Sequence, residues 1–261
     1  MPESELVGSK TEEDGVVILT LRHPPVNSLS TALLVSLAER VAEIEATPTS
    51  RAVVLTGAGQ YFSAGADVKE MSVMDRTTAP AIVARGQALF SRIERLKPPV
   101  VAAVNGLAVG GGLELAIACD LRVAGESAKF GALEVSIGLA PAYGGTQRLP
   151  RLIGIAKAKE MIFTAGMIPA SEALKIGLVN KMVPAGQELR AARDLAHTIA
   201  QKAPKAVQAS KRAIQEGREL SLVEGLKLEA NLLETEVLPS EDLGEGIAAF
   251  TEHRPPKFQG A

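Results

Sequence analysis

The 261-residue sequence has few of the residues from which disulfide frameworks and most metal sites are built. Its one cysteine is Cys119, inside an apolar run, and its three histidines (His23, His197 and His253) lie far apart. A single cysteine excludes an intrachain disulfide and a zinc site made of cysteines, and no two histidines have the spacing of metal ligands. We therefore expect no metal ion, and a structural or surface role for each of these side chains.

Clustered basic charge and long apolar runs are also absent. The formal net charge is −2 and the isoelectric point is about 6.0, with lysines and arginines scattered along the chain, so nucleic acid is not expected as a partner. No apolar run is long enough to span a membrane. The start, MPESELVGSKTEEDG, has neither the apolar core of a signal peptide nor the arginines of a transit peptide. Together with the single cysteine, this favours a cytoplasmic protein.

Common nucleotide and hydrolase motifs are missing as well. The segment GGGLE at 110–114 lacks the Lys-Ser/Thr ending of a phosphate-binding loop, and residues 110–115 do not complete the dinucleotide motif G-x-G-x-x-G. No nucleophile elbow, G-x-S-x-G, occurs. We therefore expect chemistry that is carried by carboxylates and backbone amides.

Strands and helices alternate before about residue 150. Apolar runs bounded by prolines or glycines predict strands at 15–21, 51–57 and 97–106. Apolar residues at helical spacing predict helices over 30–46, with Ser30 as its cap, and near 80–96. This alternation favours an α/β layered core, and 46% hydrophobic residues are enough to fill one.

After about residue 150 the sequence becomes mainly helical. Apolar spacing predicts helices near 151–165, 170–177, 187–202, 204–216 and 220–238, and Ser240 can cap one more. We therefore divide the chain into a core with the active site, residues 1–200, and a helical C-terminal oligomerisation region, residues 201–261. The leftover apolar faces of that region favour contacts between subunits, and packing on its own core is the alternative.

Two glycine-rich turns each follow an apolar strand and precede helical sequence: YFSAGADVKEM at 61–71 and NGLAVGGGLELA at 105–116. Three consecutive glycines weaken a helix, so they indicate a close approach of the backbone. Small neighbours leave the N–H groups of Ala66 and Gly111 uncovered, and a helix that begins near Gly111 directs its positive end at a ligand. Two converging amides make an oxyanion hole. The alternative is that the glycines serve tight turns only.

Glu114 and Glu134 are candidates for acid–base catalysis. Glu114 lies about one turn into the helix that Gly111 opens, and Glu134 lies in KFGALEVSIGLAP, an apolar stretch typical of a loop. A carboxyl group among apolar neighbours holds its proton more tightly, and two such groups close together titrate as a coupled pair. Either residue alone is more typical of a capped or partly solvated side chain, so the hypothesis rests on the combination.

Five segments spread over the chain form a pattern: PPVNSLS, YFSAGADVKEM, KPPVVAAVNGLAVGGGLELAIACD, FGALEVSIGLAPAYGGTQRLPR and AAFTEHRPPKF. This pattern resembles the enoyl-CoA hydratase/isomerase family, also called the crotonase family, over nearly the whole chain after about residue 15. The resemblance implies an α/β fold, a spiral of repeated ββα units with a helical C-terminal trimerisation region. It also implies a homotrimer, or a homohexamer made of two trimers.

The resemblance further implies an acyl-CoA thioester as substrate, with no cofactor because coenzyme A is part of that substrate. By position, the amides of Ala66 and Gly111 match the oxyanion hole, and Glu114 and Glu134 match the two catalytic glutamates of the hydratase branch. The positions that match contacts to substrate or coenzyme A are Ser28, Ala64, Ala66, Asp67, Val68, Lys69, Gly110 and Tyr143.

The implied reaction is the syn addition of water to the 2,3 double bond of a trans-2-enoyl-CoA, which gives a 3-hydroxyacyl-CoA as in fatty acid β-oxidation. Isomerases that resemble this chain typically keep the equivalent of Glu134 alone, so the presence of Glu114 favours hydration. The alternatives are a 3,2-enoyl-CoA isomerase or a hydratase of a specialised acyl-CoA on the same fold. A third is a non-catalytic protein that binds acyl-CoA or RNA.

The sequence departs from the family pattern beside the expected acyl pocket. The usual GAGGTQRL is AYGGTQRL here, so Tyr143 stands where a small residue is common. Together with Met71, Val73 and Met74, this tyrosine is expected to decide which acyl group fits.

A second departure lies near the C-terminus. His253 occupies a position where many hydratases carry a lysine that approaches the coenzyme phosphates of a neighbouring subunit. Histidine is mostly uncharged at neutral pH, so Arg254 or Lys257 would have to supply this charge.

Overall fold

A computed structural model of the protein describes residues 6–73 and 75–260. Its strands are β1 (Val7–Thr11), β2 (Val16–Leu21), β3 (Ala52–Gly57), β4 (Tyr61–Ser63), β5 (Val100–Val104), β6 (Leu107–Val109), β7 (Leu121–Gly125), β8 (Lys129–Gly131), β9 (Met167–Pro169) and β10 (Lys181–Val183). They form a six-stranded sheet in the order β1-β2-β3-β5-β7-β10 and a four-stranded sheet in the order β4-β6-β8-β9. β1 pairs antiparallel with β2, and β9 with β8, whereas the other pairs are parallel.

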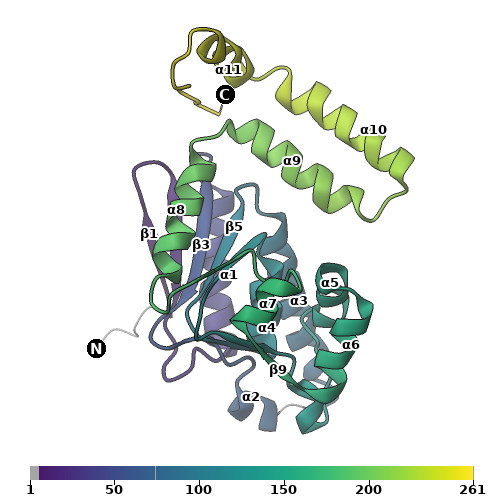
Figure 1. Cartoon of the computed structure of the whole chain (residues 1–261). Coiled ribbons are helices and arrows are strands. Elements are labelled where there is room, and N and C mark those ends of the chain that lie inside the picture. The colour runs from purple at the N-terminus through teal and green to yellow at the C-terminus, as the bar shows by residue number, and fades with distance from the viewer. Residues whose placement is uncertain (1–5, 74, 261) are drawn as a thin grey trace.

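Helices cover these sheets and form the C-terminal region (Figure 1). The helices are α1 (Thr31–Glu45), α2 (Val68–Ser72), α3 (Ala79–Arg95), α4 (Gly111–Ala118), α5 (Gly145–Ile153), α6 (Ile155–Thr164), α7 (Ala170–Lys175), α8 (Glu188–Ala200), α9 (Pro204–Gly217), α10 (Leu222–Leu232) and α11 (Glu241–Thr251). A 3₁₀ turn, η1 (Glu134–Ile137), precedes α5, and a π-helical turn, η2 (Leu233–Val237), follows α10.

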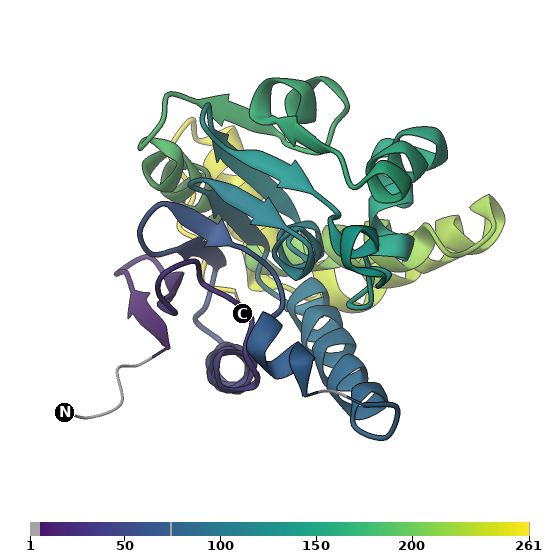
Figure 2. The same ribbon diagram turned by 90° about the horizontal axis from the view of Figure 1, so that it is seen from below.

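The first part of the chain is a repeated ββα path. β3, β5 and β7 each enter the six-stranded sheet, and the strand that follows each of them, β4, β6 or β8, enters the four-stranded sheet. Helical sequence comes next each time, and successive repeats lie side by side because their strands pair in parallel (Figure 2). The turns after β4 and β6 therefore come from neighbouring repeats.

The central strands β2, β3 and β5 are buried on both faces of the six-stranded sheet, which is why they are nearly continuous apolar runs. In β2, Val16 and Ile18 pack in the cluster that α8 covers, whereas Val17, Leu19 and Leu21 pack in the main core. That main core also contains apolar side chains from α1, α3 and α4. The sheet is thus a layer between α8 on one face and α1, α3 and α4 on the other.

The main predicted elements are confirmed. α1 begins after Ser30, whose side chain accepts a hydrogen bond from the amide of Leu33 at 3.2 Å. The predicted strands correspond to β2, β3 and β5, and α3, α7, α8 and α9 lie where apolar spacing placed them. The single helix predicted near 151–165 is instead two helices, α5 and α6, which are separated at Gly154, where φ is 83°. The helix predicted over 220–238 ends as α10 at Leu232 and continues as the π-helical turn η2. The sequence did not predict β1, β7, β10 or the four-stranded sheet. The strands of the four-stranded sheet have three residues each, which is too short to show an alternating pattern.

The C-terminal helices are tied to the core by a buried ion pair. Lys211 on α9 contacts the carboxylate of Asp120 at 2.7 Å, and the side chains are 6% and 16% exposed. The same carboxylate accepts hydrogen bonds from the amide of Val100 at 2.7 Å and the side chain of Gln215 at 2.9 Å. α9 and α10 then form an antiparallel hairpin that projects beyond the sheets (Figure 1). The division near residue 200 stays a prediction.

In the part of the chain that the structure describes, no helix is both long enough and apolar enough to cross a membrane.

We predict that Lys211→Met lowers the free energy of unfolding by about 3 kcal/mol, because it leaves the Asp120 carboxylate buried without its cation. Chemical denaturation measures this value. Lys10→Met is the matched control, since Lys10 pairs with Glu12 on the surface and its side chain is 72% exposed; its cost should stay below about 1 kcal/mol. Equal costs for the two variants would show that the buried pair does not anchor α9.

Candidate active site

A cavity of about 470 Å³ opens where the two glycine-rich turns meet. Its walls come from the β4–α2 turn with α2, the start of α3, the β6–α4 turn, η1, and the loop that precedes α5. Most of the lining is apolar, with side chains such as Leu29, Met71 and Ile82, and both Glu114 and Glu134 belong to it. We call this space the central cavity.

The two turns approach each other through their backbones. A Cβ atom on Gly65 would lie 2.8 Å from the carbonyl oxygen of Val109, and one on Gly112 would lie 2.2 Å from the carbonyl oxygen of Ser63. Real Cβ atoms do not come this close, so these positions require glycine for steric reasons. Tight packing alone therefore accounts for part of the glycine pattern.

The same packing brings two backbone amides to the central cavity. A Cβ atom on Gly111 would lie 3.6 Å from the amide nitrogen of Ala66, and both residues line the cavity. Gly111 is the first residue of α4, whose first amides have no acceptor within the helix. The positive end of the helix dipole adds to their field. An oxygen atom that gains negative charge would be stabilised here, and the role of this pair as an oxyanion hole stays a prediction.

Glu114 lies on the first turn of α4 and is 3% exposed. Its Oε1 accepts hydrogen bonds from the amides of Tyr143 at 2.8 Å and Gly145 at 2.7 Å. The pKa of Glu114 is raised to about 7, mainly by burial and also by the nearby Glu134 carboxylate, against the opposing effect of these two amides. The side chain therefore changes its protonation state near neutral pH.

Glu134 is the first residue of η1, where the sequence favoured a loop. Burial raises the pKa of its carboxyl group. Its Oε2 is buried and has no hydrogen-bond partner among the residues that the structure describes. Buried polar atoms are normally paired, so a molecule bound in the central cavity is the natural partner for this oxygen.

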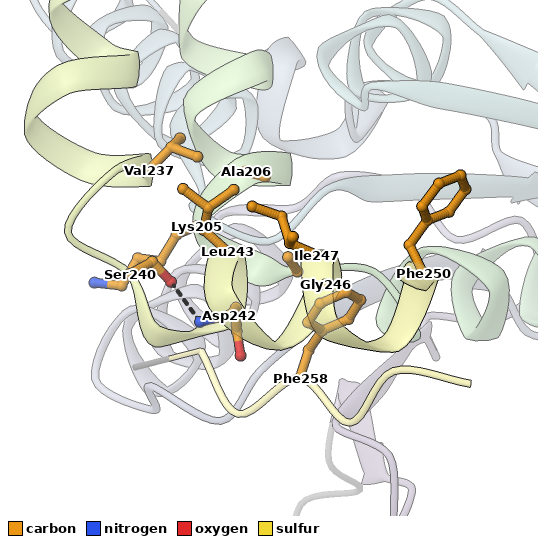
Figure 3. A pocket seen from close by; sticks show the side chains of 11 residues that line it. Lys205, Ala206, Val237, Ser240, Asp242, Leu243, Gly246, Ile247, Phe250 and Phe258 are labelled. Atoms are coloured by element: carbon orange, nitrogen blue, oxygen red, sulfur yellow. Dashed lines mark hydrogen bonds between the residues drawn. The ribbon is translucent and has the colours of Figure 1, made fainter. Parts of the chain in front are cut away.

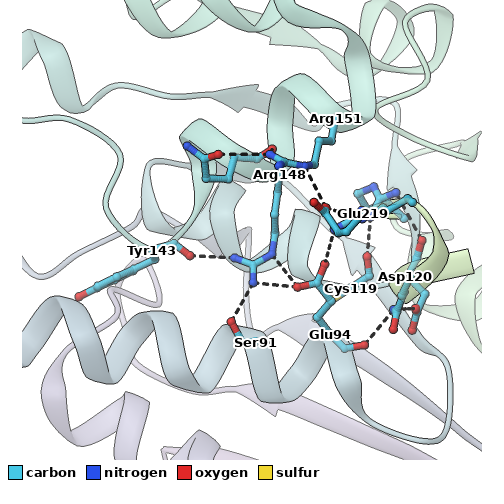
Figure 4. Close-up of polar contacts among 12 residues, drawn as sticks. Ser91, Glu94, Cys119, Asp120, Tyr143, Arg148, Arg151 and Glu219 are labelled. Carbon is cyan, nitrogen blue, oxygen red and sulfur yellow. Dashed lines mark hydrogen bonds and ion pairs between the residues drawn. The ribbon is translucent and has the colours of Figure 1, made fainter. Parts of the chain in front are cut away.

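Arg148 on α5 fixes the loop that supplies the two amides to Glu114 (Figure 4). Its guanidinium donates to the carbonyl oxygen of Tyr143 at 3.0 Å and contacts the carboxylate of Glu94 on α3 at 2.9 Å. Glu94 in turn pairs with Arg218 of the C-terminal region at 3.1 Å. The position of Tyr143 thus depends on contacts from α3 and α5, and α3 is also linked to the end of α9.

The structure places most of the predicted contact residues at the central cavity. The predicted contact residues that line it are Ala64, Ala66, Asp67, Val68, Gly110 and Tyr143. Ser28 and Lys69 lie outside the lining: the Ser28 hydroxyl donates to the Asp67 carboxylate at 2.9 Å, and Lys69 is exposed. This hydrogen bond from Ser28 is the main cause of the lowered pKa of Asp67. The binding roles of these residues stay predictions.

Two of the four residues expected to select the acyl group line the central cavity. Met71 and Tyr143 line the central cavity, whereas Val73 is 80% exposed and lies outside it. Met74 lies outside the described residues. Ile82 and Val83 of α3 belong to the lining and were not singled out from the sequence, because an apolar pair on a helix is typical of any core.

Glu70 was also not predicted as part of the site. It lines the central cavity, and its carboxylate accepts hydrogen bonds from the amide of Thr31 at 2.9 Å and the hydroxyl of Thr31 at 2.7 Å. These bonds tie α2 to the start of α1 and so support the turn that contains Ala66. An acidic residue on the first turn of a helix gives no sequence signal of such a long-range contact.

Among the described residues, no group of three or more histidine, cysteine, aspartate or glutamate side chains is arranged to hold a metal ion.

We predict that Glu114→Gln stabilises the protein at high pH. A carboxyl group with a higher pKa in the folded protein than in the unfolded chain makes folding less favourable as pH rises between the two values. For a shift from 4.5 to about 7, the stabilisation by Glu114→Gln should be about 2–3 kcal/mol larger at about pH 8 than at about pH 5. Denaturation at equal protein concentrations measures this difference.

Glu39→Gln is the control, because Glu39 is an exposed glutamate on α1. Its effect on the free energy of unfolding should be the same at both pH values. A Glu114→Gln effect that is equally independent of pH would show that the carboxyl group of Glu114 does not titrate near neutrality.

Comparison with known proteins identifies the family. The family model for enoyl-CoA hydratase/isomerase matches residues 11–261. The short-chain-enoyl-CoA hydratase of Clostridium acetobutylicum is 42% identical over 251 residues, which is 95% of this chain and 95% of the relative. The 2,3-dehydroadipyl-CoA hydratase of Escherichia coli is 40% identical over 259 residues, 98% of this chain and 99% of the relative.

Solved structures give the same result. The crystal structure of an enoyl-CoA hydratase from Bacillus anthracis superposes with a TM-score of 0.95 at 40% identity, covering 98% of this chain and all of that chain. The crotonase-like fold expected from the sequence is therefore confirmed. The chain belongs to the enoyl-CoA hydratase/isomerase family.

Proposed function

We propose that the protein is an enoyl-CoA hydratase, which adds water to the 2,3 double bond of a trans-2-enoyl-CoA and yields a 3-hydroxyacyl-CoA. The observation that carries this proposal is the presence of two carboxyl groups, the buried Glu114 and the partly buried Glu134, in one apolar cavity with the amides of Ala66 and Gly111. Relatives named as hydratases of short-chain enoyl-CoA, crotonyl-CoA and 2,3-dehydroadipyl-CoA support it.

In the proposed mechanism, the two amides stabilise the negative charge that develops on the thioester carbonyl oxygen. Water can add at C3 of a conjugated thioester only if negative charge collects on the carbonyl oxygen. The amides of Ala66 and Gly111 would donate to that oxygen, and they stabilise it more strongly as its charge grows. Because the donors are backbone groups held by packing between two turns, they need no reorganisation during the reaction.

The two glutamates activate the water molecule and transfer the protons. In the proposed step, the Glu114 carboxylate accepts a proton from the attacking water while the water oxygen bonds to C3. Glu134 in its acid form donates a proton to C2 as the enolate collapses. A pKa of about 7 for Glu114 suits a base that must lose and regain a proton in each turnover. In this mechanism both carboxyl groups would act from the same side of the enoyl group, so the addition is syn.

The proposed substrate brings its own coenzyme, so we expect hydration to proceed without an added cofactor and in the presence of a metal chelator. The β4–α2 turn, with Ala64, Asp67 and Val68 at the cavity, is the proposed path for the coenzyme A part. Near the C-terminus, Arg254 pairs with Glu245 at 2.7 Å and with Glu252 at 2.6 Å. Of the two cations that could replace the missing lysine, Lys257 is therefore the better candidate.

We predict that Glu114→Gln and Glu134→Gln each reduce the hydration rate by at least about 100-fold, because each removes one proton-transfer group. The measurement is the loss of the conjugated enoyl-thioester absorbance after purified protein is mixed with crotonyl-CoA. Binding of butyryl-CoA, which lacks the double bond, should stay similar in both variants, since a glutamine keeps the shape of the site.

The outcomes separate the candidate functions. Rapid loss of absorbance with the unaltered protein and slow loss with both variants supports the hydratase. No loss with crotonyl-CoA, but conversion of a 3-enoyl-CoA to the 2-enoyl isomer, would replace it by an isomerase. Tight butyryl-CoA binding without either reaction would indicate a non-catalytic acyl-CoA-binding protein. Near-normal turnover by one variant would remove that glutamate from the mechanism.

We also propose that the protein assembles as a homotrimer or a homohexamer through its C-terminal helices. Exposed apolar side chains gather there, including Ile214 at 72%, Leu222 at 80% and Phe250 at 83% exposure. α9 and α11 also border an apolar hollow of about 430 Å³, beside which Ile247, Phe250 and Phe258 lie (Figure 3). Apolar surface of this extent favours a contact between subunits.

We predict that Phe250→Asp lowers the mass of the assembly measured by size-exclusion chromatography with light scattering. The unaltered 27.3-kDa chain should elute with the mass of three or six copies, and a charge placed in the apolar contact should shift it toward the monomer. Val35→Asp is the control, because Val35 is an exposed apolar residue on α1, 49% exposed. An unaltered monomer, or an unchanged mass for Phe250→Asp, would contradict this contact.

A cytoplasmic location is proposed as well. It is supported by a single cysteine that is buried in the core, as expected of a protein in a reducing compartment. Fractionation of the source cells, with the protein detected by antibody, tests it.

A further inference from the structure

One face of α3 and the residue Tyr143 both line the central cavity. Ala79, Ile82 and Val83 of α3 line the cavity. The next residue on this helix face is Gly86, three to four positions later. Gly86 is buried and does not line the cavity, because the ring of Tyr143 covers it.

The position of this ring is fixed by close contacts on three sides. A Cβ atom on Gly86 would lie 2.4 Å from Cδ1 and Cε1 of Tyr143, and one on Gly111 would lie 3.4 Å from its Cδ2. The ring also packs edge-to-face on Phe90, with centroids 5.4 Å apart and an interplanar angle of 73°. Tyr143 is 8% exposed. Glycine in the middle of a helix is unfavourable, so the ring occupies space that any other residue at position 86 would fill.

The backbone and the side chain of Tyr143 have separate roles. The amide donates to Glu114 and the carbonyl accepts from Arg148, whereas the ring extends away from Arg148 (Figure 4). A substitution that shortens the side chain keeps both backbone hydrogen bonds. The contribution of the ring can therefore be measured without removing the support of Glu114.

We propose that the ring of Tyr143 is the inner end of the acyl pocket and restricts the enzyme to short acyl chains. This inference rests on the proposed function, because it requires the acyl group of a thioester to enter the central cavity. The thioester oxygen would bind at the amides of Ala66 and Gly111, and the ring lies beside Gly111, where an added Cβ atom would be 3.4 Å from Cδ2 of the tyrosine. An acyl chain directed along α3 from that point meets the ring after few carbon atoms. Behind the ring lie Gly86 and the buried side chain of Phe90.

Removal of the ring should extend the pocket along α3. Tyr143→Ala opens the space over Gly86 as far as Phe90, so carbon atoms of a longer chain replace the contacts that the ring made. We expect the ratio of kcat/KM for trans-2-octenoyl-CoA to that for crotonyl-CoA to rise at least about tenfold, since even one added methylene group in an apolar pocket has an effect of this size. Tyr143→Phe keeps the ring and should keep the ratio of the unaltered protein.

Binding is measured in parallel so that the result does not depend on catalysis. Calorimetry gives the dissociation constants of butyryl-CoA and octanoyl-CoA, and Tyr143→Ala should raise the preference for octanoyl-CoA by a similar factor. If the unaltered protein hydrates neither enoyl-CoA, the proposed function fails, but the two dissociation constants still test the role of the ring. Tyr61→Ala is the control, because Tyr61 is the other tyrosine of the chain and does not line the central cavity.

An unchanged chain-length preference in a folded Tyr143→Ala protein, by both measurements, would overturn the proposal. The same is true if Tyr143→Phe alters the preference as much as Tyr143→Ala does, because the hydroxyl group and not the ring would then decide it. If Tyr143→Ala does not fold, Tyr143→Leu serves instead: it keeps an apolar side chain over Gly86 and should move the ratio in the same direction by a smaller factor.

Discussion

The site depends on how the carboxyl group of Glu114 is held. This group is buried in the core at the start of α4, and two amides, from Tyr143 in the loop before α5 and from Gly145 at the start of α5, donate to one of its oxygen atoms. The contact joins α4 to α5 and leaves no room for a side chain at Gly145, where a Cβ atom would lie 2.9 Å from Oε1. Burial in turn sets the affinity of Glu114 for its proton. The burial of Glu114 therefore both holds its carboxyl group in place and sets its pKa.

The ββα path explains why the remaining groups meet there. Each repeat places a short strand in the four-stranded sheet and then turns into a helix, so the turns after β4 and β6 stand in neighbouring positions. Their backbones touch at Gly65 and Gly112. This contact leaves the amides of Ala66 and Gly111 at one cavity. The steric and the functional interpretations of the glycines, which the sequence presents as alternatives, describe the same contact.

The long elements and the two glutamates could be predicted from the sequence, because apolar spacing, the Ser30 cap and carboxyl groups in apolar surroundings are local signals. The short strands and the partners of Glu114 could not, since they depend on contacts between distant segments. Arg148, for example, meets Glu94 across 54 positions of the chain. Glu70 and Thr31 are also far apart in sequence, 39 positions. The residue pattern of one segment does not indicate which distant residues its side chains contact.

The close contact between Tyr143 and Gly86 limits how this family member could change over generations. Any side chain added at position 86 would collide with the ring, so Gly86 can be replaced only after position 143 has become small. The reverse order is open, because loss of the ring leaves a space that an alanine or a valine on α3 can later occupy. Substitutions at these two positions should therefore occur in a fixed order along a lineage, and the residue at one position restricts which residues the other accepts.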